Sequence, residues 1–371
     1  MNFNKSLFKT YLIYFIVIVC FVALRIFASL GAFKFVNDAF WQGNVSTIFI
    51  QVLIMGVLPV TLFMLLFKKG PKQTFNKLGF KKISLKAVLL CVAIGVLVYI
   101  LNVIVANIFG FILSMFGYSS GSGSGGGYSY DSFFKFLMGT VFVAVLPAVF
   151  EEITHRGILM RGVATNAGYK KAIIISSVMF GLMHLNVAQC FYAIFIGIII
   201  GFVSSISDSI YPAIILHFMN NFINVYFSYA ETCNLPGANL FNNITKIMSN
   251  MNIITCFLTF LLVLLVVCCL LAYLIFLLFK ETRNKQISKS IIKVASIVNE
   301  TNEEELKEEQ VITSFQQFVM PYMKNQDLID AMLPKVENYE KKHSLKTNIF
   351  KICTLFIGCL ITIFTFIWGI L

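Results

Sequence analysis

The sequence predicts an all-α protein: a polytopic transmembrane helix bundle of about eight or nine spans with a cytoplasmic helical insertion. Two observations predict this fold class. The 371 residues are 58% hydrophobic and only 12% charged, whereas about a quarter of the residues in a soluble domain are charged. Several apolar runs also reach the roughly 20 residues that a helix needs to cross a bilayer. A soluble globular fold is therefore excluded by composition and by the length of the runs.

Nine apolar runs are candidate spans: 11–31, 46–67, 86–116, 133–154, 172–188, 190–206, 211–229, 252–279 and 349–371. The first run follows Lys5 and Lys9 and is longer than the apolar region of a signal peptide, so we expect a membrane helix there. The third run would form a helix roughly 45 Å long, so it must tilt or protrude.

The distribution of Lys and Arg predicts the orientation. Residues 68–86 contain seven lysines and no acid, and the Gly/Ser-rich segment 117–132 carries one charge. Because cytoplasmic loops are enriched in Lys and Arg, we expect 68–86 and the N-terminus in the cytoplasm. The net charge of +12 is explained by such loops, so we expect no nucleic-acid partner. The Ile-, Lys- and Asn-rich composition is typical of an AT-rich bacterial genome, which predicts a multi-pass protein of a bacterial cell membrane in contact with the lipid bilayer.

These features divide the chain into five parts: N-terminal transmembrane helices at 1–130, a core at 131–230, an outer loop and helix at 231–280, a charged cytoplasmic insertion at 281–348 and a last transmembrane helix at 349–371. The insertion contains the acidic run EEELKEE and no catalytic motif. It is either a solvated helical linker or a binding site for a protein partner.

Ionisable residues inside membrane spans are costly and mark function by default. The fourth span ends in PAVFEEITHRG. Glu152 and Arg156 are four residues apart on a helix and can neutralise each other, whereas Glu151 lies about 100° away. We therefore predict Glu151 as a general base, because a carboxylate beside another one and in a low dielectric holds a proton more readily. The plainer alternative is that both glutamates form ordinary salt bridges at a helix end.

The fifth and seventh spans contribute FGLMH and HFMNN. His184 follows Phe180 by one turn in an apolar run, and His217 and Asn221 share a face one turn apart. His217, Asn220, Asn221, Asn224 and Ser228 form one polar stripe, which must face the bundle interior or a hydrated cavity. The remaining histidines, His155 and His343, are interpreted as peripheral.

Pro147 lies four residues before Glu151. Because proline has no backbone N–H, it should kink the helix and free a carbonyl near Val143. Pro212, by contrast, is expected in the first turn of its helix.

The ordered set EExxxR, FxxxH and HxxxN resembles the CAAX-protease and bacteriocin-processing (CPBP/Abi) family of intramembrane peptidases, which includes type II CAAX prenyl endopeptidases. The resemblance covers roughly residues 130–230. It implies that Glu151, His184, His217 and Asn221 line one cavity open to the cytoplasmic side. It also implies hydrolysis of a peptide bond in a membrane-associated protein or peptide, with Glu151 activating water and His217 and Asn221 stabilising the oxyanion. Glu152, Arg156 and Phe180 would support them.

The resemblance leaves the use of a metal open. His184, His217 and Glu151 are candidate Zn²⁺ ligands with a free position for water, although Asn is a poor zinc ligand and the chain has no HExxH motif. We favour metal dependence at this stage. One departure from the family is His155, where relatives usually carry an aromatic residue.

Two other function classes remain. A catalytically silent scaffold of the same fold, acting in bacteriocin immunity or secretion, would tolerate loss of Glu151. A transporter also uses buried Glu and His, but it is expected to contain inverted repeats with paired broken helices. No such repeat is visible in the sequence.

Overall fold

The computed structural model describes residues 5–36, 38–118, 130–300, 355, 358 and 359. Within these residues every regular element is helical, so the predicted all-α class is confirmed. The first helices are α1 (Lys5–Ser29), α2 (Ala39–Ile48), η1 (Phe49–Val57), α3 (Leu58–Phe67), α4 (Pro71–Lys77) and α5 (Leu85–Met115). The central run is α6 (Phe133–Gly139), η2 (Thr140–Val145), α7 (Leu146–Glu152), η3 (Ile153–Met160) and α8 (Arg161–Met183). The last are α9 (Val187–Ser207), α10 (Tyr211–Cys233), α11 (Leu240–Ser249) and α12 (Ile253–Glu300).

Six helical segments of the described chain are long and apolar enough to span a membrane, so the predicted count of eight or nine is not confirmed. The predicted spans 133–154 and 172–188 lie in one helical run, Phe133–Met183, which turns at Gly168, where φ is 77° and ψ is 159°. The predicted span 211–229 is present as helix α10, but its polar side chains make it too hydrophilic to be counted among the six segments. The predicted span 349–371 lies almost entirely outside the described residues.

Side chains at the helix ends explain where several elements begin. The Ser84 hydroxyl accepts a hydrogen bond from the Ala87 N–H at the start of α5, and the Asn186 side chain accepts one from the Gln189 N–H at the start of α9. Such caps satisfy N–H groups that have no partner within the helix. Pro212 lies in the first turn of α10, as predicted.

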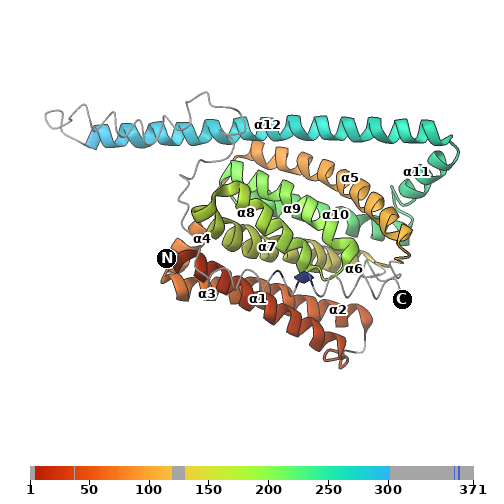
Figure 1. The fold of residues 1–371 in the computed structure, drawn as a ribbon, viewed down its shortest axis with the longest axis horizontal. Helices are drawn as coiled ribbons and strands as arrows, with labels where there is room; N and C mark the ends of the chain where they lie inside the picture. Colours follow the sequence, from red (N-terminus) through yellow and green to blue (C-terminus); the bar gives the residue numbers. More distant parts are fainter. Residues whose placement is uncertain (1–4, 37, 119–129, 301–354, 356–357, 360–371) are drawn as a thin grey trace.

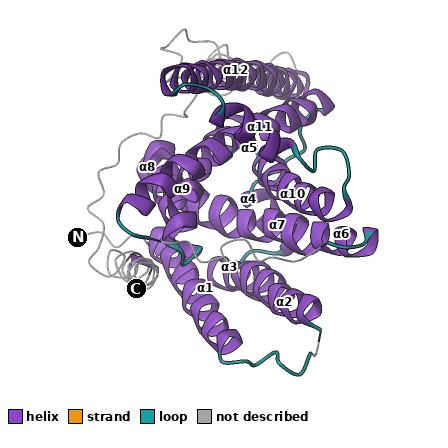
Figure 2. Ribbon diagram, turned by 90° about the vertical axis from the view of Figure 1, so that its right-hand side faces the viewer, coloured by secondary structure: helices purple, strands orange, loops and turns teal. Residues whose placement is uncertain are grey.

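The bundle is layered (Figures 1 and 2). Helix α12 lies along the outside of α5, which packs on α9 and α10; α7 and α8 follow, and α1 and α3 cover the opposite face. One apolar core joins α1, α3, η3 and α8, and includes Ile13 and Met160. A second core joins α5, α9, α10 and α12, and includes Ile94 and Leu216. The helices that carry the three motifs lie between these two cores.

One end of the bundle carries a group of charged contacts. Asp208 forms ion pairs with Lys81 and, at 2.9 Å, with Arg161. Burial alone would raise the pKa of Asp208, but the two cations outweigh it and lower that pKa. Glu281 accepts a hydrogen bond from Ser84 at the same end. The lysine-rich segment and Arg161 therefore share one end, as the alternation of spans requires. That this end faces the cytoplasm stays a prediction.

Helix α12 runs without a break from Ile253 to Glu300, so the structure shows no boundary at residue 280. The first part of the predicted insertion is thus helical and continuous with the span before it. The rest of the insertion, including the acidic run and His343, lies outside the described residues.

Candidate active site

The helix that carries the two glutamates is widened around Pro147. Proline has no N–H to donate to the carbonyl four residues earlier, and the chain before it adopts a π-helix, η2. The freed carbonyl is that of Val143, as the sequence predicts, and it accepts a hydrogen bond from Asn221 Nδ2 at 3.0 Å. The carbonyl that the proline leaves free therefore connects the fourth predicted span to α10 at Asn221, one turn beyond His217.

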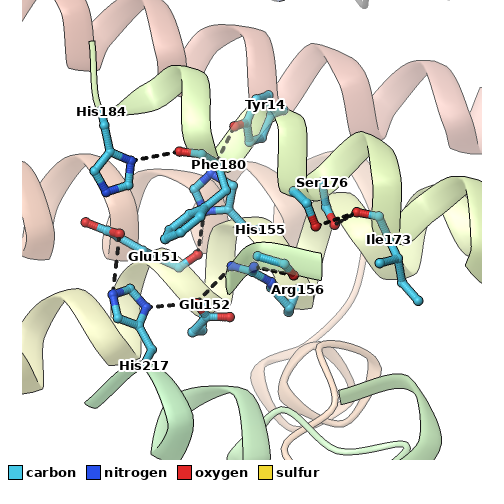
Figure 3. Close-up of polar contacts among 12 residues, drawn as sticks. Tyr14, Glu151, Glu152, His155, Arg156, Ile173, Ser176, Phe180, His184 and His217 are labelled. Carbon is cyan, nitrogen blue, oxygen red and sulfur yellow. Dashed lines mark hydrogen bonds and ion pairs between the residues drawn. The ribbon is translucent and has the colours of Figure 1, made fainter. Parts of the chain in front are cut away.

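Glu152 and Arg156 form the pair predicted from their spacing. Both side chains are 0% exposed, and Arg156 Nη1 donates to Glu152 Oε1 at 2.9 Å. The same oxygen accepts a hydrogen bond from His217 Nδ1 at 2.8 Å, which the sequence did not reveal. Glu152 thus holds both the guanidinium and the imidazole (Figure 3).

Arg156 is fixed from two further directions. Its Nη2 donates to the carbonyl of Gly197 in α9 at 3.1 Å, and its guanidinium lies 4.7 Å from the centroid of the Phe180 ring. A Cβ at Gly197 would lie 3.2 Å from Arg156 Nη2 and 3.1 Å from the Ser177 side chain. A side chain at this position would therefore push Ser177 or the guanidinium away by a few tenths of an ångström, so glycine favours the close approach of α8, α9 and Arg156.

Glu151 is held differently from its neighbour. Its side chain contacts no guanidinium; Oε1 accepts a hydrogen bond from Gln51 Nε2 in η1 at 2.7 Å. Its second oxygen, Oε2, lies 4.0 Å from His217 Nε2. Only 8% of Glu151 is exposed, and Arg161 at the charged end is ten residues away, or roughly 15 Å along the helix. The carboxylate therefore lies deep in the bundle, with one oxygen held and the other directed toward an imidazole.

The interpretation of His155 as peripheral is wrong. Its side chain is 0% exposed, and its ring nitrogens contact the Glu151 carbonyl through Nδ1 at 2.8 Å and the Tyr14 hydroxyl through Nε2 at 2.9 Å. Because a carbonyl only accepts, Nδ1 carries the proton and Tyr14 O–H donates to Nε2. The helix continues past Arg156 through η3 into α8 instead of ending at the bilayer surface, so α1 covers this position.

The ring of Phe180 lies at the centre of the histidines. The rings of His184, His155 and His217 are nearly perpendicular to it, with centroid separations of 5.0, 5.1 and 5.6 Å. His184 Nδ1 donates to the Phe180 carbonyl at 2.9 Å, which leaves Nε2 as the unprotonated nitrogen of the neutral ring. Figure 3 shows the Glu151 carboxylate between His184 and His217.

A cavity of about 200 Å³ adjoins these side chains. Its lining residues are Asn102, Val143, Phe180, His184, Gln189, Tyr192, Ala193, Ile196, Ile200, His217, Asn220, Asn221 and Asn224. Three of the four predicted catalytic residues, His184, His217 and Asn221, line the cavity. The fourth, Glu151, is not part of the lining but lies next to His217. Asn224 is exposed and lies two turns farther from the charged end than His217. An opening toward the cytoplasm stays a prediction.

The residues do not show a metal-binding geometry. Among the described residues no three His, Cys, Asp or Glu side chains are placed to hold a metal ion. His217 Nδ1 and Glu151 Oε1 are bound by Glu152 and Gln51, and partners of this kind are usual for a metal-binding imidazole and carboxylate. His217 Nε2, His184 Nε2 and Glu151 Oε2 are the atoms that would hold a metal ion. The zinc set of His184, His217 and Glu151 stays a prediction, and no step below is assigned to a metal.

Comparison with known families identifies the same segment. Residues 133–223, about a quarter of the chain, match the family described as Rce1-like, type II CAAX prenyl endopeptidase Rce1-like. The match contains all three motifs and supports the predicted resemblance to CAAX proteases over this segment. No curated protein and no solved structure matches the chain.

Proposed function

We propose that this protein is an intramembrane endopeptidase that hydrolyses a peptide bond in a membrane-associated protein or peptide with water activated by Glu151. The family match supports a CAAX-protease-like peptidase. The observation that supports Glu151 as the base is that the two glutamates have different contacts. Glu152 is bound by Arg156 and His217, whereas Glu151 directs Oε2 across 4.0 Å toward His217 Nε2.

The geometry supports a specific first step. A water molecule hydrogen-bonded to both Glu151 Oε2 and His217 Nε2 would lie about 2.8 Å from each. Glu151 takes a proton from this water as its oxygen attacks the carbonyl carbon of the peptide bond. The C–N bond then breaks, and the proton held by Glu151 passes to the leaving amine. One peptide bond and one water give one carboxylic acid and one amine.

The surrounding groups position this step. Glu152 accepts from His217 Nδ1 and so fixes the orientation of the ring, as the carboxylate of a catalytic triad does for its histidine. One hydrogen of Asn221 Nδ2 is used by the Val143 carbonyl, and an amide nitrogen carries two. The second hydrogen is available to the oxyanion that forms on the substrate.

The proposal is tested in cells that express either the wild-type protein or Glu151→Gln. Membrane peptides are compared by mass spectrometry, and we expect at least one membrane peptide to persist uncut in the variant. Glu231→Gln is the matched control, because Glu231 is an exposed acid near the far end of α10. Identical peptide sets in all three strains would favour a scaffold without catalytic activity.

We also propose that the lysine-rich end, which contains residues 68–86 and Arg161, faces the cytoplasm of a bacterial cell. The positive-inside bias supports this. A cysteine introduced at Lys72, which is exposed on α4, should react with a membrane-impermeant maleimide only after the cells are opened. Labelling in intact cells would reverse the orientation.

A further inference from the structure

The wall of the cavity contributed by α5 and α10 carries a set of amide side chains that the catalytic step does not use. Asn102 on α5 is outside the three motifs and outside the segment matched by the family. Its side chain is only 7% exposed and lines the cavity. Its Oδ1 atom is buried and has no hydrogen-bond partner among the described residues. A buried acceptor without a partner is costly, so a ligand that donates a hydrogen bond there would be favoured.

A directional chain of hydrogen bonds fixes the orientation of that acceptor. Asn102 Nδ2 donates to Asn220 Oδ1 at 2.9 Å, Asn220 Nδ2 donates to Asn221 Oδ1 at 3.2 Å, and Asn221 Nδ2 donates to the Val143 carbonyl. Each amide has its orientation set by the next, and the chain ends on the carbonyl freed by Pro147. Asn102 therefore presents Oδ1, and not its NH₂ group, as the unused end of the chain.

The neighbouring lining is also polar. Asn224 Nδ2 donates to the Asn220 carbonyl at 3.1 Å, and the Tyr99 hydroxyl donates to Asn224 Oδ1 at 3.3 Å. Asn102, Asn220 and Asn224 thus form one amide wall that extends away from His217 toward the exposed part of the cavity. Main-chain N–H and C=O groups have the same hydrogen-bonding character as this wall.

The size of the cavity gives a second constraint. Pockets for drug-sized ligands are commonly about 300–1,000 Å³ and mostly apolar, whereas this one is about 200 Å³ and carries four asparagines. A long hydrocarbon chain placed here would leave the Asn102 Oδ1 acceptor without a partner. A short stretch of extended polypeptide with small side chains would supply an N–H donor to it.

We propose that the amide wall of Asn102, Asn220 and Asn224 is a substrate subsite that binds the main chain of an extended, unlipidated peptide segment beside the cleaved bond. Asn102 Oδ1 accepts a hydrogen bond from a substrate N–H in this subsite. The inference rests on the proposed peptidase activity and deepens it. It names the substrate class as a peptide recognised through its backbone, with no lipid held at this position.

The first experiment compares paired synthetic peptides with the purified protein in lipid nanodiscs. Each pair in the library shares one sequence, with a cysteine that is either unmodified or farnesylated, and cleavage is followed by mass spectrometry. We expect kcat/KM for the unmodified member to equal or exceed that of its partner. Cleavage of farnesylated peptides alone would overturn the inference and leave the peptidase proposal intact. No cleavage in either set would overturn both.

The second experiment tests Asn102 through the substrate. Peptides with a single N-methyl group at each position in turn lack one N–H donor. One position should lower kcat/KM of the wild-type protein about tenfold, the size expected for one net hydrogen bond. This measurement on the wild-type protein does not depend on whether a variant folds.

A variant then assigns that hydrogen bond. Asn102→Leu should lower kcat/KM for the unmethylated peptide about tenfold, mainly through KM, and should show no further loss at the sensitive N-methyl position. Asn107→Leu is the control, because Asn107 lies on the same helix, is exposed and donates only to the Val103 carbonyl of its own helix. Equal sensitivity of wild-type and Asn102→Leu proteins to N-methylation would show that another group receives the N–H.

Discussion

Replacement of Arg156 by methionine isolates the energetic role of the buried ion pair. The change leaves the Glu152 carboxylate 0% exposed and without its main cation. Loss of one partner from such a pair costs about 3–5 kcal/mol, because the remaining charge is desolvated and uncompensated. For a chain of this size we expect Tm to fall by roughly 4–6 °C.

The double variant Glu152→Gln/Arg156→Met removes both charges. It still lacks the hydrogen bond to the Gly197 carbonyl and the stacking on Phe180, but it leaves no unpaired charge at position 152. We therefore expect it to be about 2 kcal/mol more stable than Arg156→Met, within the range of coupling energies between contacting residues. The double variant should nevertheless lack peptidase activity, because Glu152 also orients His217.

The assay is thermal unfolding in detergent, read by a thiol-reactive fluorophore that labels Cys91 and Cys190 once these buried cysteines become accessible. Lys135→Met is the control: it breaks the exposed ion pair with Asp131, and Tm should hardly change. If Arg156→Met and the double variant melt at the same temperature, the charge left on Glu152 is not what destabilises the single variant. The interpretation of this pair would then be wrong.

Three further perturbations give defined results. His155→Phe should destabilise the protein by about 1–3 kcal/mol, because it leaves the Tyr14 hydroxyl buried without a partner. Adding Tyr14→Phe to this variant should recover much of the loss in thermal unfolding, and no recovery would contradict the assigned contact. Gln51→Leu should lower kcat about 10-fold to 100-fold with little change in KM, since it removes a hydrogen bond to the charged carboxylate of Glu151, and an unchanged kcat would exclude a positioning role. The pKa of Asp208 is lowered by Arg161 and Lys81, so its stabilisation is fully present above its usual pKa of 3.8 and is lost as pH falls through the lowered pKa. The Tm difference between wild type and Asp208→Asn should therefore be present at pH 7 and shrink as pH falls below 3.8. A difference that grows with acidification would contradict the sign.

Chelation tests the metal question separately. The ligand-type side chains of the described residues do not converge on a metal site, so we expect peptidase activity to survive dialysis against 1,10-phenanthroline. Loss of activity that Zn²⁺ restores would support the zinc prediction.

Much of the site was visible in the sequence because helical periodicity is local. The i, i+4 spacing of Glu152 and Arg156 predicted their ion pair, and the missing N–H of Pro147 predicted the free carbonyl at Val143. Both depend only on residues within one or two turns. The three motifs also sufficed to predict the family.

Contacts between distant spans were not visible in this way. Gln51 reaches Glu151 across 100 residues of chain, and Asn102 reaches Asn220 across 118. The only signal for either was an amide in an otherwise apolar run, where a buried polar group needs a partner. Nothing in the local pattern says which partner it finds.

The predicted number of spans is not confirmed, because six segments of the described residues are long and apolar enough to cross a membrane and the last predicted span lies almost entirely outside those residues. Hydropathy registers apolar length, but it does not show where the chain turns. The turn at Gly168 requires a positive φ that glycine adopts easily, and it separates the predicted spans 133–154 and 172–188 within the run Phe133–Met183. His155 was predicted to be peripheral for a related reason. The helix does not end after Arg156 but continues through η3 into α8, and the His155 side chain is therefore inside the bundle.

The most direct measurement of the central claim is single-turnover cleavage of one identified peptide by purified wild-type, Glu151→Gln and Glu231→Gln proteins. Removal of a general base typically costs about 10²- to 10⁴-fold in rate. We predict a loss of that size for Glu151→Gln, with binding of the peptide and Tm retained, and wild-type rates for Glu231→Gln. Cleavage by Glu151→Gln at the wild-type rate would show that another group activates the water.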